Sequence, residues 1–160
     1  MTMEEIYIYS DESEARDLAE IFRRLFDEHY QHLGEDIVIA ELSCGIGLIL
    51  KHLSRLSPQA QIFGIDIDPR VAEIARSSLP SARIDTGDII QTPWRNESVH
   101  LVTSNLIYDY SGRGVFPATY TLGGLAKELD RILIPGGAFI PSSGDYLFCN
   151  DADRQPNLKM

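Results

Sequence analysis

Two carboxylates and two glycines stand where they could hold a charged nucleoside ligand. Glu41 and Asp66 each follow a short apolar run, Gly45 and Gly47 lie between them, and Asp66 is nineteen positions after Gly47. Glycines let the backbone approach a ligand closely, and an acid at the end of the second run can accept both hydroxyls of a ribose. The pattern predicts a site for a nucleoside cofactor.

The residues around the glycines separate two kinds of nucleoside cofactor. A nicotinamide or flavin site would have a third glycine three residues after Gly47, where this chain has Leu50. A carboxylate at Glu41 would repel a pyrophosphate but attract the ammonium of an amino acid. A ligand with a nucleoside at one end and an amino acid at the other therefore fits better. A nicotinamide-binding domain is the weaker alternative.

Apolar runs and amphipathic segments alternate along the chain in the way that such a site requires. Asp68 and Pro69 predict one helix start, as N-cap and first helical residue. Further helices are predicted at about 11–33, 48–57 and 122–131, and strands at about 37–42, 62–67, 82–85, 99–104 and 138–140. This alternation predicts an α/β fold with a doubly wound, mostly parallel sheet, and ligands on such sheets bind at the carboxyl ends of the strands.

Composition narrows the classes of partner. The chain has 160 residues, 14 Lys and Arg, a formal net charge of −10 and two cysteines. Polynucleotide binding depends on neutralising phosphates with basic side chains, so a nucleic-acid partner is disfavoured. Residues 1–5 do not resemble a signal peptide, and no apolar run is long enough to span a bilayer. We expect a cytoplasmic protein without a metal site.

Five motifs, read in order, resemble those of class I S-adenosylmethionine-dependent methyltransferases. The first is Glu41 to Gly47, which is similar to the family's acid and glycine loop. The other four are the segments 64–69, 86–89, 99–105 and 133–137. Together they cover roughly residues 36–143. The resemblance implies a Rossmann-like methyltransferase fold with S-adenosylmethionine as cofactor.

The resemblance also implies roles at the amino-acid end of the cofactor. Glu41 would face the ammonium, and Gly45 and Gly47 would let the backbone approach the methionine portion. Ser43 stands where the family has its first glycine. A small residue is tolerated at that position, so we expect it to line the site as well.

At the nucleoside end, the resemblance assigns one residue to each group of the ligand. Asp66 would bind the ribose hydroxyls, and Ile67 would pack on the adenine face. Asp88 would accept a hydrogen bond from the adenine amine, with Ile89 beside the ring. Asn105 would lie between the cofactor and the methyl acceptor.

The methyl acceptor is less well specified, because a sulfonium needs mainly an aligned acceptor and the exclusion of water. The segment 106–120 should cover the acceptor pocket, and Asn105, Tyr108 and Asp109 are the candidate catalytic residues. Asn105 to Tyr108 is faintly similar to the motif of adenine and glutamine amide methyltransferases but lacks both of its prolines. We expect a small-molecule acceptor, with a protein acceptor as the second choice.

The C-terminal part is short for this family. Only twenty residues follow Ile140. We therefore expect a sheet without the usual C-terminal helix and antiparallel hairpin, in which one strand at about 145–149 is all that follows. The open edge of the fifth strand would be covered by a second subunit or by a C-terminal strand, and a homodimer is expected.

These expectations describe one domain, with a helical lead-in at 1–34, a core at 36–143 and a tail at 144–160. The rival to the enzyme is a non-catalytic module that keeps the methyltransferase-like fold and works through assembly or partner binding. Three carboxylates at ligand positions favour the enzyme, because a scaffold has no use for them.

Overall fold

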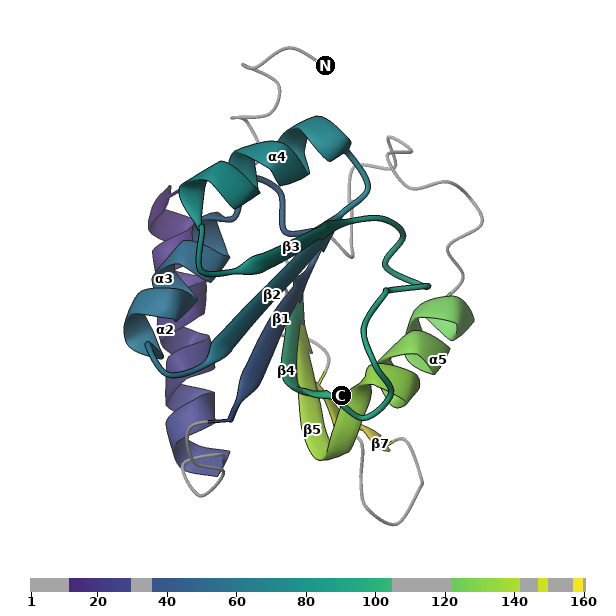
Figure 1. Ribbon diagram of the computed structural model, residues 1–160. Coiled ribbons are helices and arrows are strands. Elements are labelled where there is room, and N and C mark those ends of the chain that lie inside the picture. The colour runs from purple at the N-terminus through teal and green to yellow at the C-terminus, as the bar shows by residue number, and fades with distance from the viewer. Residues whose placement is uncertain (1–11, 30–35, 105–121, 142–146, 150–156, 160) are drawn as a thin grey trace.

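A seven-stranded sheet with helices on both faces forms the protein (Figure 1). The computed structural model describes residues 12–29, 36–104, 122–141, 147–149 and 157–159. The strand order is β3-β2-β1-β4-β5-β6-β7. The described elements are α2 (Glu12–His29), β1 (Val38–Leu42), α3 (Leu48–Leu56), β2 (Gln61–Asp66), α4 (Pro69–Ser78), β3 (Arg83–Thr86), β4 (Val99–Ser104), α5 (Leu122–Ile132), β5 (Leu133–Pro141), β6 (Leu147–Cys149) and β7 (Asn157–Lys159).

The first five strands are parallel, and β1 lies at the centre between β2 and β4. All five residues of β1 are buried, as expected for a parallel strand that is covered on both faces. The strand order reverses beside β1, so its carboxyl end is the place where a ligand of this fold binds. The predicted doubly wound, mostly parallel sheet is confirmed.

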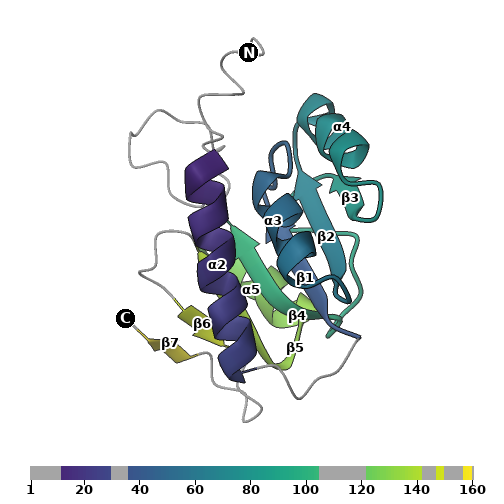
Figure 2. The ribbon, with the colours of Figure 1, turned by 90° about the vertical axis from the view of Figure 1, so that its left-hand side faces the viewer.

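Two apolar layers cover the sheet. On one face, α2, α3 and α4 pack on the sheet around Phe22, Leu50 and Leu53, which are almost completely buried (Figure 2). On the other face, α5 packs through Leu129 and Ile132. Each of these helices therefore turns an apolar face to the sheet.

The predicted start of α4 is confirmed in detail. Asp68 is the N-cap and accepts a hydrogen bond from the Arg70 backbone N–H at 2.9 Å, and Pro69 is the first helical residue. The Arg70 side chain also donates to the Asp68 carboxylate, and these hydrogen bonds lower the pKa of Asp68 to about 2. The helix begins where it does because both residues favour that position.

The segment 134–137 differs from the prediction. The prediction places it between a helix at about 122–131 and a strand at about 138–140, but it lies inside β5 (Leu133–Pro141). The register with β4 shifts between Val99 and Leu101, so the extra residues form a bulge. Gly136 has a φ of 83°, a conformation that favours glycine and lets the strand resume after the bulge.

The C-terminal expectation is wrong in one respect. β6 pairs antiparallel with β5, and β7 pairs antiparallel with β6, so the sheet does have an antiparallel hairpin. The tail provides it because three residues in each strand are enough for pairing. No helix follows β5 in the segments that are described. Since β6 covers the edge of β5, the argument that predicted a homodimer loses its basis, and the dimer stays a prediction.

Several expectations lie at or beyond the described ranges. The helix predicted at about 11–33 is found as α2, and residues 11 and 30–33 of that prediction lie outside the described residues. Within the described helices, none combines the length and apolar character needed to cross a membrane.

Candidate cofactor-binding site

The loops after β1, β2 and β3 are joined at the carboxyl edge of the sheet by Asp66. Its Oδ2 accepts a hydrogen bond from the Gly45 backbone N–H at 2.9 Å, and its Oδ1 accepts one from the Asp68 N–H at 2.9 Å. The Asp66 backbone carbonyl accepts from the Gly87 N–H, also at 2.9 Å. Asp66 is buried and connects all three loops. Each carboxylate oxygen can accept a further hydrogen bond, which leaves capacity for ligand hydroxyls.

Three residues of the loop after β1 have a left-handed backbone. The φ angles are 56° at Ser43, 55° at Gly45 and 82° at Gly47. A Cβ on Gly45 would meet nothing within 4 Å, whereas a Cβ on Gly47 would lie 3.0 Å from Leu79 Cδ1. Gly45 therefore borders open space, as a ligand-facing residue should. Gly47 instead allows α3 to pack closely against α4.

Glu41 is the most unusual charged group of this edge. Its side chain is only 2% exposed, and its Oε2 has no hydrogen-bond partner among the described residues. Burial raises the pKa of Glu41 well above its ordinary value. A hydrogen bond with the Leu50 backbone lowers this pKa, whereas the negative charge of the Asp66 carboxylate raises it further. A buried carboxylate oxygen without a hydrogen-bond partner is costly, so this site calls for a cation or a hydrogen-bond donor.

A second unpartnered polar atom lies next to Glu41. Thr103 on β4 is in direct register with Glu41, so the two side chains emerge on the same face of the sheet. Thr103 is fully buried, and its Oγ1 is likewise without a partner in the described part of the chain. A carboxylate oxygen and a hydroxyl side by side suit an ammonium group, which donates up to three hydrogen bonds.

The residues predicted to contact the adenine differ in their exposure to solvent. Ile67 is 61% exposed directly after β2, so it offers an apolar surface for a flat ring. Asp88 is half-buried, and its Oδ1 accepts from the Ile90 N–H at 2.9 Å. Ile89 is buried in the same apolar cluster as Trp94. Asp88 and Ile67 can therefore contact a ligand as they stand, whereas Ile89 acts as part of the core under the site.

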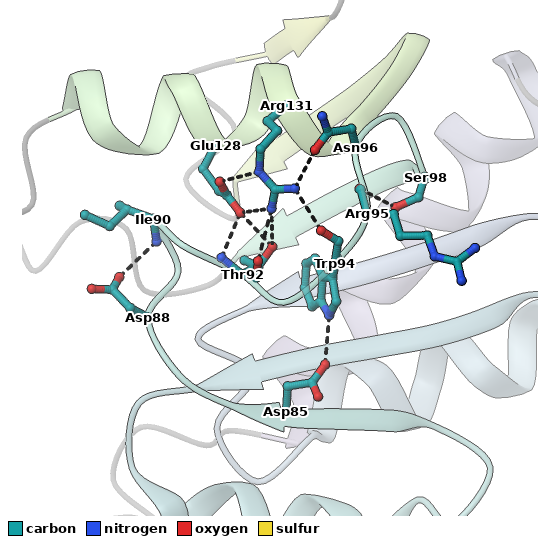
Figure 3. A network of polar contacts seen from close by, with 10 residues as sticks. All are labelled: Asp85, Asp88, Ile90, Thr92, Trp94, Arg95, Asn96, Ser98, Glu128 and Arg131. Atoms are coloured by element: carbon teal, nitrogen blue, oxygen red, sulfur yellow. Dashed lines mark hydrogen bonds and ion pairs between the residues drawn. The ribbon is translucent and has the colours of Figure 1, made fainter.

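The loop between β3 and β4 depends on residues that the motifs did not indicate. Figure 3 shows Glu128 and Arg131 reaching from α5 to Thr92 and Trp94 in this loop. Opposite charges three residues apart on a helix indicate an ion pair, and that signal was available in the sequence. Nothing in the sequence pointed to Thr92, which is thirty-six residues away from Glu128.

Cys44 lies in the glycine loop and is buried. Burial raises the pKa of its thiol well above the ordinary value, and the Glu41 and Asp66 carboxylates raise it further. The thiol therefore stays protonated and is a packing residue rather than a nucleophile.

Three candidates cannot be placed, since Asn105, Tyr108 and Asp109 lie outside the described residues. They stay predictions. In the described part of the chain, no three His, Cys, Asp or Glu side chains are grouped closely enough to hold a metal ion.

Comparison with known sequences identifies the family. The family described as "Methyltransferase domain" matches residues 40–140. A malonyl-[acyl-carrier protein] O-methyltransferase of Legionella pneumophila is 30% identical over 105 residues, which are 64% of this chain and 34% of the relative. A tRNA (guanine-N(7)-)-methyltransferase of Danio rerio is 26% identical over 92 residues, which are 58% of this chain and 36% of the relative. The chain thus spans about a third of the length of these relatives.

Solved structures share the fold. Geranyl diphosphate methyltransferase in complex with SAM matches with a TM-score of 0.60 and 16% identity over 79% of this chain and 48% of that chain. DesVI of Streptomyces venezuelae matches with a TM-score of 0.59 and 21% identity over 81% of this chain and 49% of that chain. The strand order, the carboxyl-edge site and the match over residues 40–140 agree. This chain belongs to the methyltransferase-domain family, as the resemblance of its motifs predicted.

Proposed function

We propose that this chain is the cofactor-binding domain of an enzyme that transfers a methyl group from S-adenosylmethionine. The observation that carries the proposal is the buried Glu41 carboxylate, whose Oε2 has no partner among the described residues. It lies at the carboxyl end of the central strand, where this fold binds its ligands. An amino-acid ammonium bound there would neutralise it, whereas a pyrophosphate would not.

The neighbouring residues suit the rest of such a ligand. The Asp66 carboxylate is held by two backbone N–H groups and can still accept from two ribose hydroxyls. Ile67 presents an exposed apolar side chain for the adenine face, and Asp88 presents a carboxylate for its amine. Gly45 leaves space for the chain that joins the two ends. All four were predicted as contacts from the sequence, and we retain them as proposals.

In methyl transfer, these residues would bind the cofactor and orient it toward the acceptor. S-adenosylmethionine supplies a methyl group that its positive sulfonium has already activated. Glu41 and Asp66 would hold the two ends of the ligand and thereby fix its orientation for methyl transfer. The acceptor would be aligned by the segment after β4, to which Asn105, Tyr108 and Asp109 belong. Asp109 would remove a proton from the acceptor where the acceptor carries one.

The acceptor does not follow from the relatives. By their names, they act on malonyl-[acyl-carrier protein], a tRNA guanine and geranyl diphosphate, which are three different chemical classes. We propose a small-molecule acceptor because a net charge of −10 disfavours a nucleic acid. Cytoplasmic location is part of the same proposal, and the homodimer stays a prediction.

Calorimetric titration with S-adenosylhomocysteine and S-adenosylmethionine tests the proposal, with NAD as the control ligand. We expect micromolar dissociation constants for the first two and no binding of NAD. The Glu41→Gln variant should bind both adenosyl ligands more weakly because it loses the charge that faces the ammonium. Binding of NAD alone would replace the proposal with the nicotinamide alternative. No binding of any of the three would favour a non-catalytic module.

A further inference from the structure

The loop between β3 and β4 carries Asp88 at its start and is fastened to α5 farther along. Two side chains of α5, Glu128 and Arg131, point into this loop from one helical turn (Figure 3). Most of the polar contacts that hold the loop to the rest of the protein pass through them. The motifs that identify the family include neither residue.

Glu128 is the buried half of this pair. Its Oε1 accepts hydrogen bonds from the Thr92 backbone N–H and from Thr92 Oγ1, both at 2.7 Å. Its Oε2 accepts from Arg131 Nε at 2.9 Å. Burial would raise the pKa of Glu128, but the hydrogen bonds from Arg131 and Thr92 outweigh burial and hold the pKa below its ordinary value. Glu128 is therefore ionised at neutral pH, and both of its carboxylate oxygens accept hydrogen bonds from Thr92 or Arg131.

Arg131 contacts the other half of the loop. Its guanidinium donates to the backbone carbonyls of Trp94 at 2.8 Å and Thr92 at 3.1 Å, and to Asn96 Oδ1 at 2.9 Å. A planar guanidinium with five donors can satisfy these acceptors and Glu128 at once, which a lysine cannot do. The pair thus fixes three loop residues relative to α5.

The fixed part of the loop continues to the adenine-binding candidates. Asp88 Oδ1 accepts from the Ile90 N–H at 2.9 Å, and its carbonyl accepts from the Gln91 N–H at 3.1 Å, directly before Thr92. Ile89 shares an apolar cluster with Trp94 and with Leu125 and Leu129 of α5. The backbone between Asp88 and Thr92 therefore has little freedom while Thr92 is held.

We propose that Glu128 and Arg131 are positioning residues that hold Asp88 in place to recognise the amino group of the adenine. The inference rests on the proposed function, since it assumes an adenosyl ligand. The inference goes beyond the proposed function by assigning the selectivity for adenine to two residues that do not touch the ligand. An ion pair with a buried carboxylate that holds one loop through both backbone and side chains suits this role, because small shifts of Asp88 would lengthen its hydrogen bond to the adenine amine.

The test compares two ligands that differ at the adenine amine. S-adenosylhomocysteine has that amino group, and S-inosylhomocysteine has a carbonyl oxygen in its place. The wild-type protein should bind the first at least tenfold more tightly. In the Glu128→Gln and Arg131→Lys variants, we expect this ratio to fall to about threefold or less, through weaker binding of S-adenosylhomocysteine. The Asp88→Ala variant gives the ratio that remains when the carboxylate is absent.

Two exposed residues of the same helix provide matched controls. Asp130→Asn makes an acid-to-amide change like that of Glu128→Gln, and Lys127→Gln removes a cation. Both should leave the ratio unchanged. Trp94 is the one tryptophan of the chain and is buried, so its fluorescence reports on the loop without any ligand. Its emission should shift to longer wavelength in the Glu128 and Arg131 variants but not in the controls.

The outcomes separate the inference from the proposed function. A wild type that binds neither ligand contradicts the proposed function. A wild type that binds both equally, or folded Glu128 and Arg131 variants that keep the full ratio, would overturn the inference alone. Should both variants fail to fold, Asn96→Ala loosens the loop while keeping the ion pair. An unchanged ratio together with a shifted Trp94 emission in that variant would also overturn the inference.

Discussion

The two ends of the candidate site are held in place by different means. At the carboxyl ends of β1 and β2, the proposed ligand groups are themselves structural, since the Asp66 carboxylate holds the backbone of Gly45 and Asp68. In the loop between β3 and β4, the proposed ligand group is Asp88, but Glu128 and Arg131 hold the loop. Recognition and stability share the same atoms in the first region and are assigned to different residues in the second.

This difference predicts how each region responds to mutation. Where one carboxylate both binds the ligand and orders the loops, its removal should lower the ligand affinity and the stability of the fold together. Where the supporting residues stand apart from the ligand, a substitution should lower stability or selectivity separately. Four sets of variants test this contrast.

The largest effect is expected for Asp66→Ala. Loss of the ribose contacts should weaken S-adenosylhomocysteine binding about 100-fold, and two part-buried N–H groups would lose their acceptor, at a cost of about 1–3 kcal/mol in the free energy of unfolding. Calorimetry and urea unfolding measure the two quantities. Asp130→Ala, an exposed acid on α5, is the control and should change neither. A loss of affinity at full stability would break the proposed coupling.

Glu41→Gln should change how stability depends on pH. The pKa of Glu41 is raised in the folded protein, mainly by burial. Between the unfolded pKa of about 4.3 and the higher folded pKa, the folded state binds more protons, so stability falls as pH rises. One carboxyl contributes at most about 1.4 kcal/mol per pH unit.

Urea unfolding of both proteins from pH 4 to pH 8 measures this contribution as a difference. The glutamine variant should lose the decline and therefore gain stability relative to the wild type as pH rises. Other groups that titrate cancel in the comparison. Curves that run parallel over the whole range would show that Glu41 ionises normally in the folded protein.

The glycines Gly45 and Gly47 should separate binding from packing within one loop. Gly47→Ala places a Cβ 3.0 Å from Leu79 Cδ1 in a left-handed backbone, and we expect a loss of about 2–3 kcal/mol in stability. Gly45→Ala has free space, so only the backbone cost of about 1 kcal/mol applies. Its new methyl group would instead project toward the ligand and weaken binding about tenfold, or about 1.4 kcal/mol. Equal losses of affinity would contradict the distinction.

The smallest effect concerns two threonines with opposite surroundings. Thr92 Oγ1 donates to the buried Glu128, so Thr92→Val should cost about 1 kcal/mol in stability. Thr103 Oγ1 is buried without a partner among the described residues, so Thr103→Val should be neutral or stabilising. The same chemical change thus has opposite expected signs. Thermal unfolding of both variants measures it, and equal losses would mean that the Thr103 hydroxyl has a partner after all.

Much of the fold was predictable because its signals are local. The strand β4 (Val99–Ser104) and the start of α4 at Asp68 follow from an apolar run and a cap, which depend on neighbours in sequence. The strand predicted at about 145–149 is found as β6, but the bulge in β5 and the strand β7 that completes the hairpin were missed. A bulge depends on the register with β4, and a strand of three residues such as β7 has no periodicity to detect.

By itself, the sequence determined the family, the alternation of strands and helices and the residue types of the ligand edge, because glycine, cap and carboxylate signals lie within a few residues of one another. Tertiary structure alone decided how those residues act. It buried Glu41 beside Thr103, made Gly47 a packing residue and Gly45 an open one, and brought Glu128 to Thr92. The reason is that burial and long-range pairing depend on which elements meet in the folded sheet, and no local pattern records this.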